Sequence, residues 1–178
     1  ITSYWEADWS RKTDLSYEAA CVRLRELITD ATRARLISDV PIGAFLSGGV
    51  DSSTVVAAMA ATASGTVKTF SIGFGHAEFN ETQYARMVSR QFGTTHEEFI
   101  VEPNAIEILP KLAWHFDQPF SDSSALPTYY VSRMTRDRVT VALNGDGGDE
   151  LPRLGHGCDP LGVAASASEV QSGQASGA

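Results

Sequence analysis

The stretch IGAFLSGGVDSS, residues 42–53, sets a short apolar run directly before a loop rich in serine and glycine. The apolar run is typical of a strand that is buried on both faces of a parallel sheet. Residues 52–63 are rich in Ala, Val and Met and contain no helix breaker, which predicts a buried helix. A strand, a glycine-rich loop and a helix N-terminus in this order form a phosphate-binding site, because glycines let the backbone approach the ligand and the first helical amides are unpaired.

The side chains of the loop SGGVDSS also suit a nucleotide. Ser47, Ser52 and Ser53 offer hydroxyl donors, and Asp51 offers a hard oxygen ligand that suits Mg²⁺ beside bound phosphates. The loop is not a Walker A motif, since it lacks the GK[ST] ending. The alternative is a serine-glycine turn that only caps the helix, with Asp51 as a local hydrogen-bond acceptor.

Hydrophobic patterns along the chain predict alternating strands and helices. The expected helices cover residues 16–38, 52–63, 80–92, 103–116 and 126–137, and the expected strands cover residues 42–46, 67–74, 96–101 and 139–143. Strands separated by helices imply right-handed crossovers, so the predicted fold is a three-layer α/β/α arrangement around an open parallel sheet. Residues 1–150 form the expected domain, and residues 151–178, dominated by Gly, Ala, Ser and Pro, read as an aberrant or disordered low-complexity tail.

A second glycine-rich loop, NGDGGDE at residues 144–150, follows the last expected strand. In an open parallel sheet, loops at the carboxyl ends of the strands that flank the switch point face one crevice. If the strands ending at Leu46 and Leu143 are neighbours, Asp51 and Asp149 can converge on one metal ion while Asp146 reaches toward the reacting centre. The alternative is a solvated glycine loop whose acids need no partner.

Charge and hydropathy exclude two classes of partner. The formal net charge of −8 repels phosphate backbones and argues against a nucleic-acid surface. No apolar stretch approaches the roughly 20 residues of a membrane span, so a cytoplasmic protein is expected. His76, His96 and His115 lack the spacing of metal ligands and are expected to be structural or solvated.

Several motifs together resemble the synthetase domain of the asparagine synthase family. They are SGGVDSS, TFSIGF (residues 69–74), NETQYARMVSRQFGTTHEEF (residues 80–99), FDQPFSDSSALPTYYVS (residues 116–132) and NGDGGDE, and they occur in the family's order and spacing from about residue 1 to residue 150. The resemblance implies the ATP-pyrophosphatase, or PP-loop, type of the adenine nucleotide alpha hydrolase-like fold.

The resemblance also implies roles for individual residues, with ATP and Mg²⁺ as cofactors. The strand from Phe70 to Phe74 lines the adenine pocket, and the backbone of Leu46 and Ile72 contacts the nucleotide. Asp51 and Asp149 hold Mg²⁺. Pyrophosphate is bound by the serines and glycines of the first loop, which are Ser47, Gly48, Gly49, Ser52 and Ser53. Gly145 and Asp146 border the acyl-adenylate and are the expected catalytic residues, although family members best known for asparagine synthesis have a glutamate at the position of Asp146.

The activity implied by the resemblance is an ATP-dependent amidotransferase that forms asparagine from aspartate through a β-aspartyl-adenylate and releases AMP and pyrophosphate. Glutamine or ammonia supplies the nitrogen in the intact enzyme, which can be a homodimer. One alternative is a fragment that binds nucleotide but is inactive. Others are related adenylating synthetases with another carboxylate substrate, such as β-lactam synthetases, lasso-peptide cyclases or exopolysaccharide-associated amidotransferases, and ATP-pyrophosphatases that act on tRNA, GMP precursors or NAD precursors.

Two parts of the family pattern are missing from this sequence. The family begins with a glutaminase domain and continues beyond the second loop with a helical region that carries a catalytic lysine. This sequence opens at Ile1 without the first part and continues after Glu150 with LPRLGHGC, so the chain alone is expected to be inactive. In the segment before the helix at 126–137, Asp122, Ser123 and Ser124 either face the acceptor pocket or cap that helix.

Overall fold

A computed structural model describes residues 2, 12–75, 81–102, 104–118 and 122–146 of the chain. The helices are α1 (Tyr17–Arg35), α2 (Val50–Thr62), α3 (Thr82–Phe92), α4 (Ala105–Phe116) and α5 (Ala125–Thr135), and the strands are β1 (Ile42–Phe45), β2 (Lys68–Phe74), β3 (Thr95–Val101) and β4 (Val141–Leu143). The helices and strands expected from the sequence are therefore confirmed, with small shifts at their ends. The expected tail at residues 151–178 lies outside the described residues.

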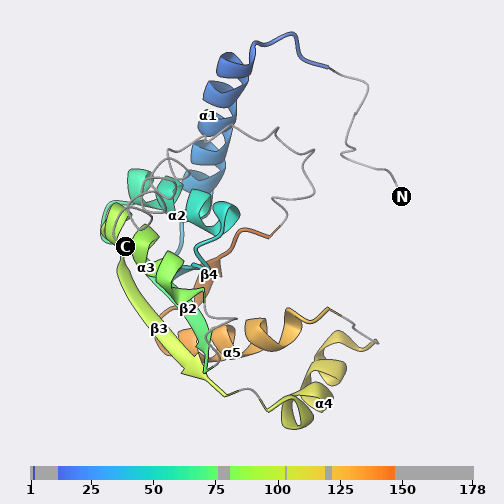
Figure 1. The fold of residues 1–178 in the computed structure, drawn as a ribbon. Helices are drawn as coiled ribbons and strands as arrows, with labels where there is room; N and C mark the ends of the chain where they lie inside the picture. Colours follow the sequence, from blue (N-terminus) through green and yellow to red (C-terminus); the bar gives the residue numbers. More distant parts are fainter. Residues whose placement is uncertain (1, 3–11, 76–80, 103, 119–121, 147–178) are drawn as a thin grey trace, which may run out of the picture.

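The strands form a parallel sheet with the order β3-β2-β1-β4 (Figure 1). The chain runs from β1 outward through β2 to β3 and then returns to place β4 on the other side of β1, where Ala44 pairs with Leu143. The direction of the chain therefore reverses between β1 and β4. In parallel sheets of this kind, ligands bind outside the carboxyl ends of the strands at such a switch point.

Helices cover both faces of the sheet, as right-handed crossovers require when the direction of the chain reverses. On one face, α2 and α3 pack against the sheet around a cluster that contains Ala44, Leu46, Val56, Met59, Val67 and Ala85. On the other face, α5 packs against β2 and β3 around a cluster that contains Phe70, Val131 and Val139. The three-layer α/β/α prediction is confirmed.

The remaining helices extend the layers on either side. Helix α1 packs against α2, and α4 contacts α5 (Figure 1). Helix α1 begins after Ser16, whose hydroxyl accepts a hydrogen bond from the amide of Ala19 at 3.3 Å, and α3 ends at Gly93, which adopts the left-handed conformation. Among the described residues, no helix is long and apolar enough to cross a membrane.

Candidate functional site

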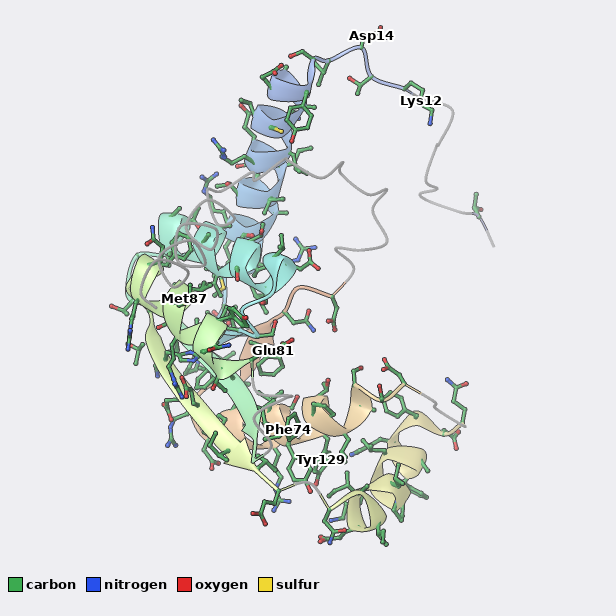
Figure 2. All side chains as sticks on the ribbon, viewed as in Figure 1. Lys12, Asp14, Phe74, Glu81, Met87 and Tyr129 are labelled. Atoms are coloured by element: carbon green, nitrogen blue, oxygen red, sulfur yellow. The ribbon has the colours of Figure 1, made fainter. Side chains whose placement is uncertain are left out.

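A cleft of about 410 Å³ opens at the carboxyl ends of the central strands. Its wall is formed by Phe45, Leu46, Ser47, Ser52, Phe70, Ser71, Ile72, Phe74, Glu81, Thr82, Ser124, Pro127, Thr128, Val131, Asn144, Gly145 and Asp146. Figure 2 labels two of these residues, Phe74 at the end of β2 and Glu81 at the start of α3. The cleft therefore lies at the switch point between β1 and β4, where the topology predicts a ligand.

The two sides of the cleft differ in chemistry. Toward α5, the wall is apolar, since Phe70 and Val131 belong to the core cluster on that face and Phe45 and Ile72 pack against it. Around the start of α2, Ser47 and Ser52 supply hydroxyl groups. The cleft thus offers an apolar side to a planar ring and a polar side to charged groups.

The first loop is shaped by its own serine side chains. Ser52 Oγ donates to the carbonyl oxygen of Gly49 at 3.2 Å, and the Ser47 and Ser52 hydroxyls lie 3.0 Å apart. The amide of Gly49 donates to Ser47 Oγ at 3.2 Å. The loop is therefore held in place at the N-terminus of α2, where helical amides and the helix dipole favour an anion.

Gly48 joins this loop to the first turn of α3. Its φ of +89° lies in the left-handed region, and a methyl group at this position would lie 2.4 Å from Tyr84 Cβ and 2.6 Å from the amide nitrogen of Ala85. Only glycine satisfies both the backbone conformation and the close approach. This tight packing fixes the position of the loop against the first turn of α3.

Gly145 joins the second loop to the start of α2. A methyl group at Gly145 would lie 2.7 Å from the amide nitrogen of Ser52 and 2.8 Å from Asp51 Cβ. The two glycine-rich loops are thus in backbone contact, and the condition set from the sequence, that their strands are neighbours, is met by the pairing of β1 with β4. In the same loop, Asn144 Nδ2 donates to Asp146 Oδ2 at 2.7 Å, which orients that carboxylate.

The structure brings most of the predicted site residues to one place. Leu46, Ser47, Ser52, Ile72, Gly145 and Asp146 line the cleft. Gly48 and Gly49 form the backbone of the first loop, and Asp51 lies exposed in the first turn of α2. Asp149 lies outside the described residues. Among the described residues, no group of three or more His, Cys, Asp or Glu side chains is placed to hold a metal ion.

Ser53 occupies a different environment from the other serines of the loop. Its side chain is completely buried, and its hydroxyl makes no hydrogen bond within the part of the chain that the structure describes. Its amide donates to the carbonyl oxygen of Gly49 at 3.0 Å as the first bond of the helix. In this conformation the hydroxyl does not face the cleft, so a role for Ser53 in binding pyrophosphate stays a prediction.

Sequence reasoning missed much of the apolar wall and the start of α3. Phe45, Pro127 and Val131 line the cleft, although in the sequence they have the pattern of ordinary core residues. Phe70 and Phe74 also line it, and they belong to the strand that the resemblance places at the adenine pocket.

In the segment before α5, Ser124 lines the cleft and stands at the N-cap of the helix, but its side chain makes no capping hydrogen bond. The amide of Ser124 donates to Asp122 Oδ1 at 2.8 Å, and this bond lowers the pKa of Asp122. A role for the segment in the acceptor pocket stays a prediction.

Comparison with known proteins identifies relatives of the chain. The asparagine synthase family matches residues 23–157, which is more than half of the chain. A Methanocaldococcus jannaschii protein assigned as glutamine-hydrolysing asparagine synthetase 2 is 48% identical over 129 residues, which cover 71% of this chain and 25% of that protein. The glutamine-hydrolysing asparagine synthetase 1 of Bacillus subtilis (strain 168) is 40% identical over 129 residues, which cover 72% of this chain and 20% of that protein.

The chain spans about a quarter or less of the length of these curated relatives. Among solved structures, an NH3-dependent NAD synthetase from Campylobacter jejuni aligns with a TM-score of 0.49 and 16% sequence identity, over 88% of this chain and 74% of that chain.

Proposed function

The chain belongs to the asparagine synthase family, and we propose from this membership that it binds ATP in the cleft and forms the adenylating site of an ATP-dependent amide ligase. The observation that carries the proposal is the backbone contact between Gly145 and the first turn of α2. This contact makes the two glycine-rich loops parts of one site rather than two separate turns. A turn that only caps a helix has no need of such a contact.

The shape of the cleft supports one orientation of the nucleotide. Its base lies on the apolar side formed by Phe70, Ile72 and Val131, and its phosphates extend toward the loop that ends at Ser52. There the amides and the dipole of α2 attract the phosphate charge. The Ser47 and Ser52 hydroxyls, 3.0 Å apart at the cleft wall, are the side-chain groups closest to this path in the loop.

Asp51 gives a physical reason for a divalent cation. A carboxylate in the first turn of α2 would repel phosphates at the same helix end unless a cation lay between them. Asp51 and Asp146 are exposed carboxylates with the hard oxygen atoms that Mg²⁺ prefers, so the residues present fit this ion. We propose Asp51 as a ligand, together with Asp149 from the second loop. Bound Mg²⁺ would neutralise charge that develops on the leaving phosphates.

The proposed reaction overcomes the low reactivity of a carboxylate. One oxygen of the β-carboxylate of aspartate attacks the α-phosphorus of ATP, the bond to the bridging oxygen breaks, and pyrophosphate leaves. Ammonia then attacks the acyl carbon of the β-aspartyl-adenylate, and AMP leaves with asparagine as the product. Asp146, whose carboxylate is held by Asn144, is proposed to border the adenylate. The fixed amides of the two loops supply electrostatic stabilisation.

An isotope experiment tests the adenylation step. Aspartate labelled with ¹⁸O in its β-carboxylate is incubated with ATP, Mg²⁺ and ammonium, using a polypeptide in which this chain is joined to the glutaminase and lysine-bearing parts of the family. One labelled oxygen is expected in AMP, because the attacking oxygen stays with phosphorus when the acyl bond breaks. Label found in phosphate or absent from AMP would contradict the acyl-adenylate. The chain alone is expected to show no turnover.

A second candidate function uses the same adenylation chemistry with a different carboxylate substrate. By the resemblance, the exposed Asp146 stands where family members best known for asparagine synthesis have a glutamate, so the proposed acceptor acid can differ from aspartate. The test is a screen of carboxylates for pyrophosphate release in the same polypeptide. Release that depends on another acid and not on aspartate would favour a related adenylating amide synthetase. The homodimer and the cytoplasmic location implied by the resemblance stay proposals, and so does ammonia as a substrate.

A further inference from the structure

A buried network of polar side chains lies behind one wall of the cleft, between β2, β3 and α3. His96 is at its centre, with a side chain only 8% exposed. The Nδ1 atom of His96 lies 2.9 Å from Thr69 Oγ1, and its Nε2 atom lies 3.2 Å from Ser71 Oγ. Ser71 is also one of the residues that line the cleft, so it belongs both to the network and to the cleft wall.

The direction of each hydrogen bond follows from the number of protons available. The hydroxyl of Ser89 donates to the carbonyl oxygen of Thr94 at 3.4 Å, and Thr94 Oγ1 donates to Ser89 Oγ at 2.9 Å. Because Thr94 has then used its only hydroxyl proton, the 2.8 Å contact between Thr94 and Thr69 requires Thr69 to donate. Thr69 in turn has no proton left for His96 and must accept one from Nδ1.

The tautomer of His96 determines whether the Ser71 hydroxyl donates or accepts. A neutral imidazole that donates through Nδ1 has only a lone pair at Nε2, so the Ser71 hydroxyl donates to His96. Ser71 then has no proton for a ligand and keeps only its oxygen lone pairs. The Ser71 hydroxyl is therefore an acceptor toward any further partner.

Burial is the largest influence on the ionisation of His96, and the charge of Glu98 acts in the opposite direction. Burial lowers the pKa of His96, which favours the neutral ring. The charged groups near it are Glu98 on β3, whose Oε1 lies 3.6 Å from Nε2, and Arg86 on α3. Arg86 donates to both oxygens of Glu98, at 2.6 and 2.7 Å, so this carboxylate already has its own cation.

We propose that His96 is a positioning residue that fixes the Ser71 hydroxyl as an acceptor for an N–H or O–H group of the nucleoside in the cleft. The proposal rests on the proposed nucleotide function. An oxygen that can only accept disfavours the oxygen atoms of a phosphate, and Glu81, another residue of the cleft wall, is an acceptor as well. The donor is thus a ribose hydroxyl or the exocyclic amine of the base.

A spectroscopic measurement tests the network without any ligand. Imidazole ¹⁵N chemical shifts of His96 in the 178-residue chain are expected to show the neutral tautomer protonated at Nδ1. The tautomer protonated at Nε2 would overturn the proposal, because Ser71 could then donate to a ligand. The tautomer reports the direction of the hydrogen bonds in the network, and contact between Ser71 and a ligand is tested separately by affinity.

Titration calorimetry of the same chain with MgATP tests the role of Ser71. Ser71→Ala is expected to weaken binding by about threefold to tenfold, the size of one hydrogen bond. The matched control Ser64→Ala, at an exposed serine after α2, is expected to leave the affinity unchanged. Equal affinities for Ser71→Ala and the parent chain would overturn this inference alone, whereas no binding by the parent chain would overturn the proposed function as well.

Three analogues then identify the donor. The effect of Ser71→Ala is expected to vanish for one of 2′-deoxy-ATP, 3′-deoxy-ATP or purine riboside triphosphate, each of which lacks one candidate donor group. An effect of equal size with ATP and with all three analogues would overturn a direct hydrogen bond from the nucleoside to Ser71. Because each comparison uses the same variant, a general loss of stability cannot produce the expected pattern.

Discussion

Gly145 and Asp51 come from different glycine-rich loops, yet a methyl group at Gly145 would lie 2.8 Å from Asp51 Cβ. The loops follow β4 and β1, which pair in parallel, so strand pairing brings them to the same edge of the sheet. The contact places the carboxylate-bearing loop, with Asp146 at the cleft wall, beside the helix end proposed to hold phosphates. The first loop contributes Asp51 and the amides of α2, and the second contributes Asp146.

Replacing Gly48 with alanine is expected to destabilise the fold by more than the strain of placing alanine at a positive φ. The added methyl group would overlap Tyr84, while Gly93 has a φ of +64° and no atom of the described residues within 4 Å of the equivalent position. Gly93→Ala should therefore cost only the conformational strain of about 1 kcal/mol, and Gly48→Ala should cost more than about 2 kcal/mol. Urea unfolding of both variants measures the difference. Equal losses would show that the loop does not pack tightly on α3.

Asp51→Asn should remove most of the effect of Mg²⁺ on ATP binding. The substitution keeps the shape of the side chain but removes the negative charge, so the affinity gained on adding Mg²⁺ should fall by about tenfold or more. Calorimetry with ATP in the presence of Mg²⁺ and of a chelator measures this gain. Asp117→Asn is the matched control, since Asp117 has a φ of 52°, which asparagine tolerates. A full Mg²⁺ effect in Asp51→Asn would exclude Asp51 as a ligand.

Stability should rise with pH because of His96. Burial lowers the pKa of His96 in the folded chain, so between that value and the ordinary one of about 6.5 the unfolded chain binds more protons. The free energy of unfolding should thus be larger at about pH 7.5 than at about pH 5.5. Glu98 stays ionised in this window, because the hydrogen bonds from Arg86 lower its pKa.

The control for this pH dependence is His96→Gln, which cannot titrate in that window. Urea unfolding at both pH values should give a smaller difference for the variant than for the parent chain. If the two proteins show the same difference, another group is responsible for the pH dependence.

Much of the fold can be predicted from local sequence patterns. Alternating strands and helices imply a parallel sheet, and the order of strand, SGGVDSS and helix predicts the first loop as an anion site. The pairing of Ala44 with Leu143 is different, because nothing in either segment specifies a partner so far along the chain. The sequence therefore leaves open whether these two strands are neighbours, and the structure shows that they are.

Several features of the site could not be predicted, because they depend on contacts between segments that are far apart in the sequence. Phe45 and Val131 look like core residues in the sequence, and only the position of the cleft shows that they also form its wall. Ser52 and Ser53 are neighbouring serines of the same loop. In the first turn of α2, however, the side chain of Ser53 is buried in the protein. The role of His96 depends on the hydroxyls of Thr69 and Ser71, which reach it through strand register.

The most direct test of the account is the affinity of the 178-residue chain for MgATP, measured by calorimetry in Gly145→Ala and Gly65→Ala. A methyl group at Gly145 would meet the backbone of Asp51 and Ser52, whereas at Gly65 it would meet no atom within 4 Å in the part of the chain that the structure describes. If both glycine-rich loops form the nucleotide site, the parent chain and Gly65→Ala bind MgATP, and Gly145→Ala binds it with an affinity lower by about tenfold or more. No binding by the parent chain, or equal affinity in both variants, would contradict a nucleotide site formed by these two loops.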